Sequence, residues 1–319
     1  MRYRKLGHSG LKVSEIALGS WFDGQPIQDE WALSHILGEA FEKGINYIDM
    51  ADIYHKGETE SLFGKLLKSY PRQNLVLSSK CYWPMSESIN DQGLSRKHIF
   101  ESLHASLKRL GTDYLDLYLC HAEDPDTPLE ETIRALADLI KQGKILHWGV
   151  CSWQSSTLIK VKDICENLQA PLPITHQVIY NLLEFHPQRE HLPLAKSLGL
   201  GVTVWSPFAG GILAHGNLQR CLEQQNTESS YLRHADVLWR LPHQEQANKK
   251  LALFTELAQE ANLTKAQLAL AWILRREEVS SIVTGLGSSN HLENQLALYE
   301  KTVSEEIFQE VEYLFEVDH

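Results

Sequence analysis

The chain has 319 residues and a mass of 36.4 kDa, which is enough for two domains of ordinary size or for one larger domain. Hydrophobic residues make up 43% of the chain and charged residues 22%, a globular composition that excludes a disordered chain, a collagen-like repeat and a coiled-coil rod. The formal net charge of −11 argues against nucleic acid and anionic membrane surfaces as partners, because both attract basic proteins.

The N-terminal segment MRYRKLGHSG carries charge but is followed by no apolar segment, and no stretch of the chain approaches the ~18 apolar residues of a membrane span. We therefore expect a cytoplasmic protein without a membrane partner. The five cysteines include no CxxC pair and the fifteen histidines include no HExxH spacing, so we expect neither a disulfide framework nor a metal site.

Segments rich in β-branched and aromatic residues alternate with amphipathic segments along the chain, and no low-complexity linker separates them. Eight of them predict strands, at 15–19, 45–50, 74–80, 114–121, 145–150, 174–180, 201–207 and 279–285. Apolar runs joined by connections of helical length are typical of parallel strands that are covered on both faces. The sequence therefore predicts one α/β domain over residues 1–319.

Helical spacing fills the connections between these strands. In the segment 29–44, apolar residues recur at i, i+3, i+4, i+7 and i+8 from Leu33 onward, and Gly44 follows as a stop signal. Ser95 and Thr127 are suited to begin the helices after the third and fourth strands, because their hydroxyl groups can accept hydrogen bonds from the first helical turn.

Eight successive strand–helix units favour a closed (β/α)8 barrel of the TIM type over an open sheet. A doubly wound sheet that binds a dinucleotide would carry GxGxxG after its first strand, where this chain has SWFDG. Residues 1–14 predict a β-hairpin, with its turn between Gly7 and Gly10, that could close the bottom of the barrel. The long polar loop at 208–250, after the seventh strand, is expected to form a lid.

Polar residues at the carboxyl ends of three adjacent strands predict the reactive site, because active sites of such barrels lie at that end. The second strand ends at Asp49 and is followed by Tyr54, the third ends at Lys80, and the fourth ends at His121. An ammonium group near a phenol favours the phenolate, so Lys80 should lower the pKa of Tyr54 from about 10 towards the working range.

In this interpretation Tyr54 donates a proton to a carbonyl oxygen, Asp49 holds Lys80, and His121 orients the carbonyl group or shares the proton. The sequence contains no GxSxG elbow, Gly-rich phosphate loop or metal-ligand set that would indicate another chemistry. We therefore expect carbonyl reduction, with the hydride supplied by a cofactor.

Each of these residues also has a structural interpretation, in which Asp49 and Asp52 cap the loop after the second strand and the others serve packing or solvation. Their joint placement on successive strands favours a shared site. Cys81 and Cys120 adjoin two of them, and strand alternation predicts that both thiols face the helix layer as packing groups. A hydrolase with paired carboxylates is a weaker alternative, because no partner acid lies at another strand end.

The ordered motifs GINYIDMADIY, LSSK, GLSRKHI, YLDLYLCH, TPLEETIRAL, GKILHWGVCSW, HQVIYNLLE and VTVWSPFAGGIL resemble the aldo-keto reductase superfamily over nearly the whole chain. The branch that they resemble contains the potassium-channel β subunits and bacterial glyceraldehyde-phosphate-type reductases. The resemblance implies a (β/α)8 barrel and a catalytic tetrad of Asp49, Tyr54, Lys80 and His121. Channel subunits typically carry asparagine at the tetrad histidine, so His121 favours an enzyme.

The resemblance further implies a nicotinamide cofactor, NADPH or, as the other candidate, NADH, bound without a Rossmann domain. Ser152 and Gln177 would hydrogen-bond the carboxamide, and Trp205 would stack on the ring and fix the face that delivers hydride. The implied nicotinamide and pyrophosphate positions are Trp21, Asp49, Ser152, Gln177, Trp205, Ser206, Pro207 and Phe208.

At the adenosine end, relatives read GASxxEQLxEN where this chain reads GLGSSNHLENQ. The implied adenosine positions are Gly285, Gly287, His291, Asn294 and Gln295 or, with a slip of one residue, Glu293 and Asn294. The family's lysine after GGxLTG is absent, so Arg220, Arg233 or Lys249 of the insertion would have to supply positive charge to a ribose phosphate.

The predicted function is NAD(P)H-dependent reduction of an aldehyde or ketone to an alcohol, with a small-molecule carbonyl compound as the partner. The alternative is a cofactor-binding regulatory subunit with little catalysis. Tyr82 and Trp83, in the loop after the third strand, predict an aromatic, apolar lining of the substrate pocket. The sequence predicts no particular oligomeric state.

Overall fold

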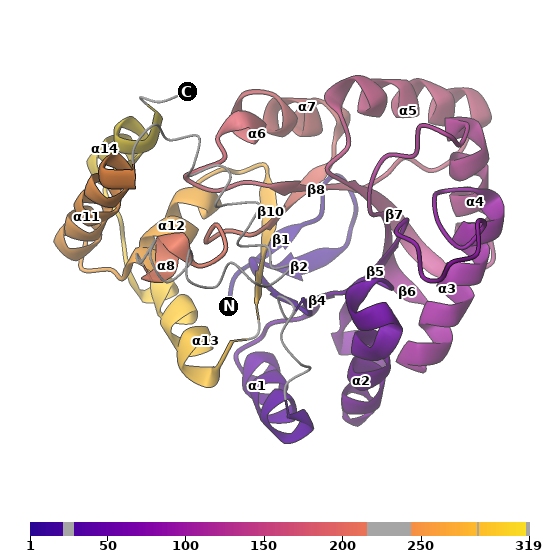
Figure 1. Cartoon of the computed structure of the whole chain (residues 1–319), viewed down its shortest axis with the longest axis horizontal. Helices are drawn as coiled ribbons and strands as arrows, with labels where there is room; N and C mark the ends of the chain where they lie inside the picture. The colour runs from indigo at the N-terminus through magenta and orange to yellow at the C-terminus, as the bar shows by residue number, and fades with distance from the viewer. Residues whose placement is uncertain (22–28, 216–243, 286, 317–319) are drawn as a thin grey trace.

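The structure is a computed structural model that describes residues 1–21, 29–215, 244–285 and 287–316. Eight parallel strands form a closed barrel in the order β10-β3-β4-β5-β6-β7-β8-β9, and a separate antiparallel pair, β1 and β2, precedes them (Figure 1). The predicted (β/α)8 barrel with an N-terminal hairpin is therefore confirmed. The strand bounds are β1 Tyr3–Lys5, β2 Lys12–Ser14, β3 Ile16–Gly19, β4 Tyr47–Asp49, β5 Val76–Cys81, β6 Leu115–Cys120, β7 Ile145–Cys151, β8 Thr175–Ile179, β9 Gly201–Trp205 and β10 Val279–Gly285.

Each of the eight predicted strands corresponds to one barrel strand, with bounds that differ by a few residues. The residues of most barrel strands are buried on both faces, because one face lines the barrel interior and the other packs against the helix layer. This double burial explains why the strands read as apolar runs rather than as alternating patterns.

The helices form a ring outside the barrel (Figure 1). Their bounds are α1 Glu30–Glu42, α2 Glu58–Leu66, α3 Arg96–Leu110, α4 Leu129–Lys141, α5 Ser155–Leu168, α6 His186–Arg189, α7 His191–Leu198, α8 Ile212–His215, α11 Gln244–Glu260, α12 Lys265–Leu274, α13 Ser289–Leu296 and α14 Glu305–Glu316. Short 3-10 helices are η1 Tyr54–Gly57, η2 Leu67–Ser69, η3 Arg72–Asn74 and η4 Ala297–Glu300. No helix among the described residues is both long and apolar enough to cross a membrane.

Two helix starts can be compared with the prediction. Ser95 caps α3 as expected, since its side chain accepts a hydrogen bond from the backbone N–H of His98. Thr127 does not cap α4, because Pro128 occupies the capping position. Most of the predicted lid, residues 216–243, lies outside the described residues, and α11 already begins at Gln244, so the predicted end of the lid at residue 250 falls inside this helix.

The N-terminal hairpin closes the lower end of the barrel. Leu6 and Val13 are fully buried and belong to an inner apolar cluster with side chains that point into the barrel from β3, β4, β5, β6 and β10. Gly7 has a φ of +59°, and a Cβ at this position would lie 2.5 Å from the carbonyl oxygen of Gly199, so only glycine fits this turn. The predicted closure of the barrel bottom is confirmed.

Candidate active site

Lys80, near the carboxyl end of β5, is completely buried. Its Nζ lies 2.6 Å from Oδ2 of Asp49, 2.8 Å from the carbonyl oxygen of Met50 and 3.4 Å from the hydroxyl oxygen of Tyr54. These partners belong to β4 and the loop after it, and β4 is the neighbouring strand of the barrel. A buried ammonium group is stable only when it is paired and hydrogen-bonded, and these contacts meet that condition.

Asp49, the last residue of β4, is held from several directions. Besides the contact with Lys80, its Oδ1 accepts hydrogen bonds from Oγ of Ser78 at 2.9 Å and from Nε2 of Gln177 at 3.0 Å. These contacts fix the orientation of a carboxylate that is almost fully buried. Asp49 can therefore hold Lys80 in one position.

Tyr54 lies in the loop after β4, at the start of η1. The next two residues, His55 and Lys56, have φ values of 48° and 52°, a left-handed conformation that turns the chain sharply after the tyrosine. The tyrosine ring lies 5.1 Å from the ring of Trp21 and 5.9 Å from that of His121, in both cases between ring centroids. The structure thus brings the phenol, the indole of Trp21 and the imidazole of His121 to one end of the barrel.

The pKa of Tyr54 differs from the expectation. Burial of the phenol raises this pKa most, Lys80 lowers it and Asp49 raises it, so that it rises from 10.0 to about 12. The prediction that Lys80 brings the pKa towards neutrality is therefore wrong for this arrangement, because Asp49 offsets the charge of Lys80 and burial penalises the phenolate. The hydroxyl group is protonated at neutral pH, as a proton donor must be.

The same surroundings keep Lys80 charged. Burial by itself would lower the pKa of Lys80, but the negative charge of Asp49 and the adjacent phenol of Tyr54 outweigh this effect and raise the pKa above its usual value. The site therefore holds a permanent positive charge 3.4 Å from the hydroxyl oxygen of Tyr54.

His121 follows β6, and its backbone N–H donates a hydrogen bond of 3.0 Å to the carbonyl oxygen of Cys81 at the end of β5. The imidazole ring lies 6.4 Å from the ring of Trp83, which in turn packs edge-on against Tyr82 at 5.0 Å. Trp21 and Trp83 are partly exposed beside the tetrad residues. They give this end of the barrel aromatic, apolar walls.

The residues assigned to the nicotinamide lie on β8, at the end of β9 and directly after β7. Ser152 follows β7 with a φ of 55°, and its backbone N–H donates a hydrogen bond of 2.8 Å to the carbonyl oxygen of Gln177. The thiol of Cys151 lies within 3.8 Å of Oγ of Ser152 and 3.7 Å of Oε1 of Gln177. The two polar side chains assigned to the carboxamide thus lie near the same thiol, and Gln177 also bonds to Asp49.

Trp205 ends β9, and its buried indole Nε1 makes no hydrogen bond to any described residue. Ser206 follows with a φ of 54°, and its carbonyl oxygen accepts a hydrogen bond of 2.9 Å from Nδ2 of Asn181. Pro207 is buried, and Phe208 packs against the core between barrel and helices. The sequence analysis missed Asn181, although it lies in the motif HQVIYNLLE.

A pocket lies between the N-terminal ends of α1 and α13, away from the tetrad. Its lining residues are Asp29, Trp31, Ala32, His35, Ile36, Gly287, Ser288 and Ser289. Gly287 is the one predicted adenosine position among them. Gly285 ends β10 in a position where a side chain would meet open space. The sequence analysis missed Trp31, because an exposed tryptophan in an amphipathic helix carries no signal of its own.

The other predicted adenosine residues lie further along α13. A Cβ at Gly287 would lie 2.4 Å from Nδ1 of His291, so these two residues are in close contact. Oδ1 of Asn294 lies 3.0 Å from the hydroxyl of Thr264, which caps α12, and Gln295 is buried. Of the cations considered for a ribose phosphate, Lys249 lies on α11, and Arg220 and Arg233 lie outside the described residues.

Comparison with known proteins decides the family. A sequence model of the aldo/keto reductase family matches residues 15–316. The chain belongs to the aldo/keto reductase family. The chain is similar to three proteins named as potassium channel β subunits, which supports the branch that its motifs resemble.

The "Probable voltage-gated potassium channel subunit beta" of Oryza sativa is 35% identical over 310 residues, 93% of this chain and 91% of the relative. The Arabidopsis thaliana protein of the same name is 33% identical over 307 residues, 93% and 90% of the two chains. A "Putative voltage-gated potassium channel subunit beta" of Schizosaccharomyces pombe is 35% identical over 288 residues, 89% and 83% of the two chains.

A second carboxylate lies behind the tetrad. Asp52 is fully buried, and its Oδ2 accepts a hydrogen bond of 2.7 Å from the hydroxyl of Ser102, which in turn accepts one of 3.0 Å from Tyr118. Burial raises the pKa of Asp52 to about 7; Ser102 lowers it, and the carboxylate of Glu60 raises it further. Asp52 therefore belongs to a buried network between β6, α3 and the loop that carries Tyr54.

The thiols beside the tetrad face the helix layer. Cys81 and Cys120 belong to the large apolar cluster between barrel and helices, and burial raises the pKa of both thiols well above the usual value. A thiol is a nucleophile only as the thiolate, so these groups serve packing. The prediction for both cysteines is confirmed.

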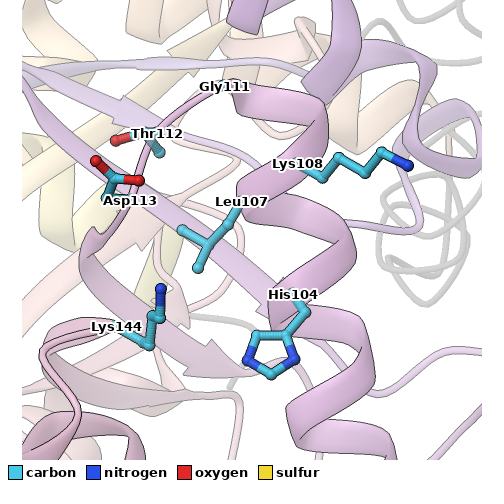
Figure 2. Close-up of a pocket in the computed structure, with 7 residues that line it drawn as sticks. All are labelled: His104, Leu107, Lys108, Gly111, Thr112, Asp113 and Lys144. Carbon is cyan, nitrogen blue, oxygen red and sulfur yellow. The ribbon is translucent and has the colours of Figure 1, made fainter.

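Another pocket contains no tetrad residue in its lining (Figure 2). It lies beside the C-terminal end of α3 and the starts of β6 and β7, at the end of the strands opposite to Lys80 and His121. Its lining residues are His104, Leu107, Lys108, Gly111, Thr112, Asp113 and Lys144. We assign it no role in catalysis.

Proposed function

We propose that this chain reduces an aldehyde or ketone to an alcohol with a nicotinamide dinucleotide as the hydride donor. One observation carries the proposal: a buried lysine ammonium group lies between a carboxylate and a tyrosine hydroxyl, 2.6 Å from the former and 3.4 Å from the latter. A protonated phenol beside a fixed positive charge is suited to donate a proton to an oxygen that gains negative charge.

The residues near Asp49 fit a nicotinamide. The polar side chains of Ser152 and Gln177 lie close to the same thiol, and Trp205, at the end of β9, offers an aromatic ring on which a flat group can stack. When bound there, the nicotinamide supplies hydride to the carbonyl carbon.

The chain's own residues would manage the proton. The hydroxyl of Tyr54, whose pKa is raised to about 12, remains protonated until the carbonyl oxygen becomes basic enough to accept its proton. The positive charge of Lys80 stabilises the phenolate that forms, and Asp49 keeps Lys80 in place. The imidazole of His121, 5.9 Å from the tyrosine ring, is placed to orient the carbonyl oxygen.

We propose NADPH as the cofactor, on the family resemblance, and NADH as the alternative. The pocket between α1 and α13 would receive the adenosine, since Gly287 lines it. Among the described residues, its lining contains no lysine or arginine, so a permanent positive charge that would select a ribose phosphate has to come from elsewhere. Fluorescence titration with NADPH and with NADH measures this preference.

The proposed location of the enzyme is the cytoplasm. The four described cysteines are unpaired and buried, which is consistent with a cytoplasmic enzyme.

The test is an assay of the purified chain with NADPH and 4-nitrobenzaldehyde, followed by the loss of cofactor fluorescence. We expect turnover by the natural chain and loss of turnover in Tyr54→Phe, with cofactor binding retained. If the natural chain binds the cofactor but oxidises it no faster than Tyr54→Phe with a panel of aldehydes and ketones, the proposed enzymatic function is rejected.

That outcome would favour a second candidate function, a cofactor-binding regulatory subunit. The observation in its favour is that three relatives named as channel β subunits align with 89–93% of this chain. His121 argues against it, because such subunits typically carry asparagine at this tetrad position. His121→Asn is therefore an informative variant: a marked loss of turnover would indicate that the natural chain uses this histidine in catalysis.

A further inference from the structure

Three potential metal ligands meet where α6 passes into α7. His186, Glu190 and His191 each offer one ligand atom, and these atoms all lie within 4.8 Å of one another. Within the described part of the chain, no other group of three histidine, cysteine or acidic side chains is as close. The helices lie at the outer edge of the barrel, next to β8 (Figure 1). The cluster is thus separate from the tetrad, which lies inside the barrel mouth.

The backbone around the cluster is firmly held. Pro187 is buried, and Gln188 accepts a hydrogen bond of 2.7 Å from the hydroxyl of Tyr180 and donates one of 3.3 Å to Glu312 of α14. His186 comes directly before these two residues. Its position relative to α7 is therefore fixed by the core, and only its exposed side chain needs to move when an ion binds.

His191 is oriented from two sides. The hydroxyl of Ser155, at the start of α5, lies 3.3 Å from its Nδ1. Hydrogen-bond partners of this kind commonly fix the imidazoles that bind metals. Behind His191, the ring of His176 on β8 lies 5.1 Å away, and both of its buried ring nitrogens lack a hydrogen-bond partner among the described residues.

The contacts among the described residues explain the three side chains only in part. His186 and Glu190 form an ion pair, with Nε2 and Oε2 3.1 Å apart, and the hydroxyl of Ser155 lies beside one ring nitrogen of His191. Neither contact requires the ligand atoms of all three residues to converge within 4.8 Å of one another, as a bound cation would.

We propose that His186, Glu190 and His191 bind a divalent transition-metal ion, with zinc as the best match. Two imidazole nitrogens and one carboxylate oxygen form a ligand set that zinc favours, and water can fill the remaining position. Zinc bonds of about 2.0–2.2 Å place tetrahedral ligand atoms roughly 3.3 Å apart. The atoms of the cluster can reach this spacing by rotation of the exposed side chains of His186 and Glu190.

A metal ion bound by these three residues would link α6 to α7 on the outside of β8. Gln177, the residue of β8 that follows His176, bonds to Asp49 inside the barrel. The spacing HPQREH matches none of the metal motifs used in reading the sequence, which is why a site at these residues was not expected.

The test uses the full chain without a histidine tag, freed of metal with a chelator and then dialysed. Cobalt(II) is added as a spectroscopic probe, and zinc affinity is measured by competition with a chromophoric chelator. The variants are His186→Gln and Glu190→Gln. His186 is 67% exposed, so its replacement should leave the fold intact, which thermal unfolding of the metal-free proteins checks.

His35→Gln is the matched control. His35 is also exposed and also pairs with a glutamate four residues later, at 3.5 Å from Glu39, but belongs to no three-residue cluster among the described side chains. Loss of only the hydrogen-bond partner of a metal ligand lowers affinity about 10- to 100-fold, so loss of a ligand should lower it by about tenfold or more.

We expect the natural chain and His35→Gln to bind zinc equally, and both cluster variants to bind it at least about tenfold more weakly. A visible cobalt absorption that is lost only in the cluster variants would agree with this. The proposal is overturned if His186→Gln and Glu190→Gln bind zinc as tightly as the natural chain, or if the natural chain binds none. None of these measurements requires carbonyl reduction.

Discussion

Gln177 and Asp49 are joined by a hydrogen bond of 3.0 Å between Nε2 of the glutamine and Oδ1 of the aspartate. The residues lie on β8 and β4, which are separated by three strands in either direction around the closed barrel, so the bond crosses its interior. Ser78 and Lys80 supply further hydrogen bonds to the same carboxylate. This carboxylate therefore links the lysine of the tetrad to a residue assigned to the cofactor.

Replacement of Tyr54 by phenylalanine removes the proposed proton donor but keeps the ring. General acid catalysis contributes about 10²–10⁴-fold, so we expect kcat to fall by about this factor in Tyr54→Phe, with the Kd for NADPH nearly unchanged. Steady-state kinetics and fluorescence titration measure the two quantities. Tyr313→Phe is the control, because Tyr313 is 75% exposed on α14. Equal kcat values for the two variants would remove Tyr54 from the mechanism.

Lys80→Met leaves the carboxylate of Asp49 buried without its cation. Breaking a buried ion pair from one side costs about 3–5 kcal/mol, so we expect the free energy of unfolding to fall by about this amount. The double variant Asp49→Asn/Lys80→Met removes both charges and should recover part of the loss while remaining inactive. Urea denaturation of the natural chain and both variants tests this. A double variant less stable than Lys80→Met would show that the ion pair is not the cause.

The stability of the protein should fall as the pH rises from about 4 to about 7 because of Asp52. Burial raises the pKa of this carboxyl to about 7, so over this interval the folded state binds more protons than the unfolded state. Linkage then favours unfolding as the pH rises, and a shift of about three units corresponds to at most about 4 kcal/mol.

Asp52→Asn removes this titration and can still accept the hydrogen bond from Ser102. We expect the free energy of unfolding of the variant, relative to that of the natural chain, to be higher above about pH 7 than below about pH 4. Urea denaturation at the two pH values measures this difference. Asp113→Asn, at an exposed position, is the control and should show no such change. If the free energies of unfolding of the natural chain and of Asp52→Asn differ by the same amount at all pH values, the raised pKa of Asp52 is contradicted.

Trp31 is the residue through which the pocket between α1 and α13 can be tested. Its side chain is 74% exposed and lines this pocket together with Gly287. Stacking of a base on an aromatic side chain is worth about 1–3 kcal/mol, so Trp31→Ala should weaken cofactor binding by about 5- to 150-fold and leave kcat at saturating cofactor unchanged.

Trp83→Ala is the matched comparison, because Trp83 lies beside His121 at the barrel mouth. It should raise KM for the aldehyde and leave the Kd of the cofactor unchanged. Fluorescence titration and steady-state kinetics of both variants decide the assignment. If Trp31→Ala binds the cofactor as the natural chain does, the adenosine does not bind in this pocket.

Much of the fold could be predicted from the chain alone, because strand and helix patterns are local. The segment INYIDM became β4 with Asp49 at its end, and YLDLYLCH became β6 with His121 directly after it. The predicted end of the insertion at residue 250 was misplaced, because α11 begins at Gln244. A polar helix has no clear start signal in the sequence. Thr127 failed as a helix cap because the proline after it takes that position.

The sequence by itself determined the order of strands, the hairpin that closes the barrel, and the placement of Asp49, Tyr54, Lys80 and His121 at neighbouring strand ends, because each depends on residues close together in the chain. Only the tertiary structure decided the bond from Gln177 to Asp49, the raised pKa of Tyr54, and the meeting of His176 with His191. Burial and contacts across the barrel depend on which distant segments the closed sheet brings together, and no local pattern records that.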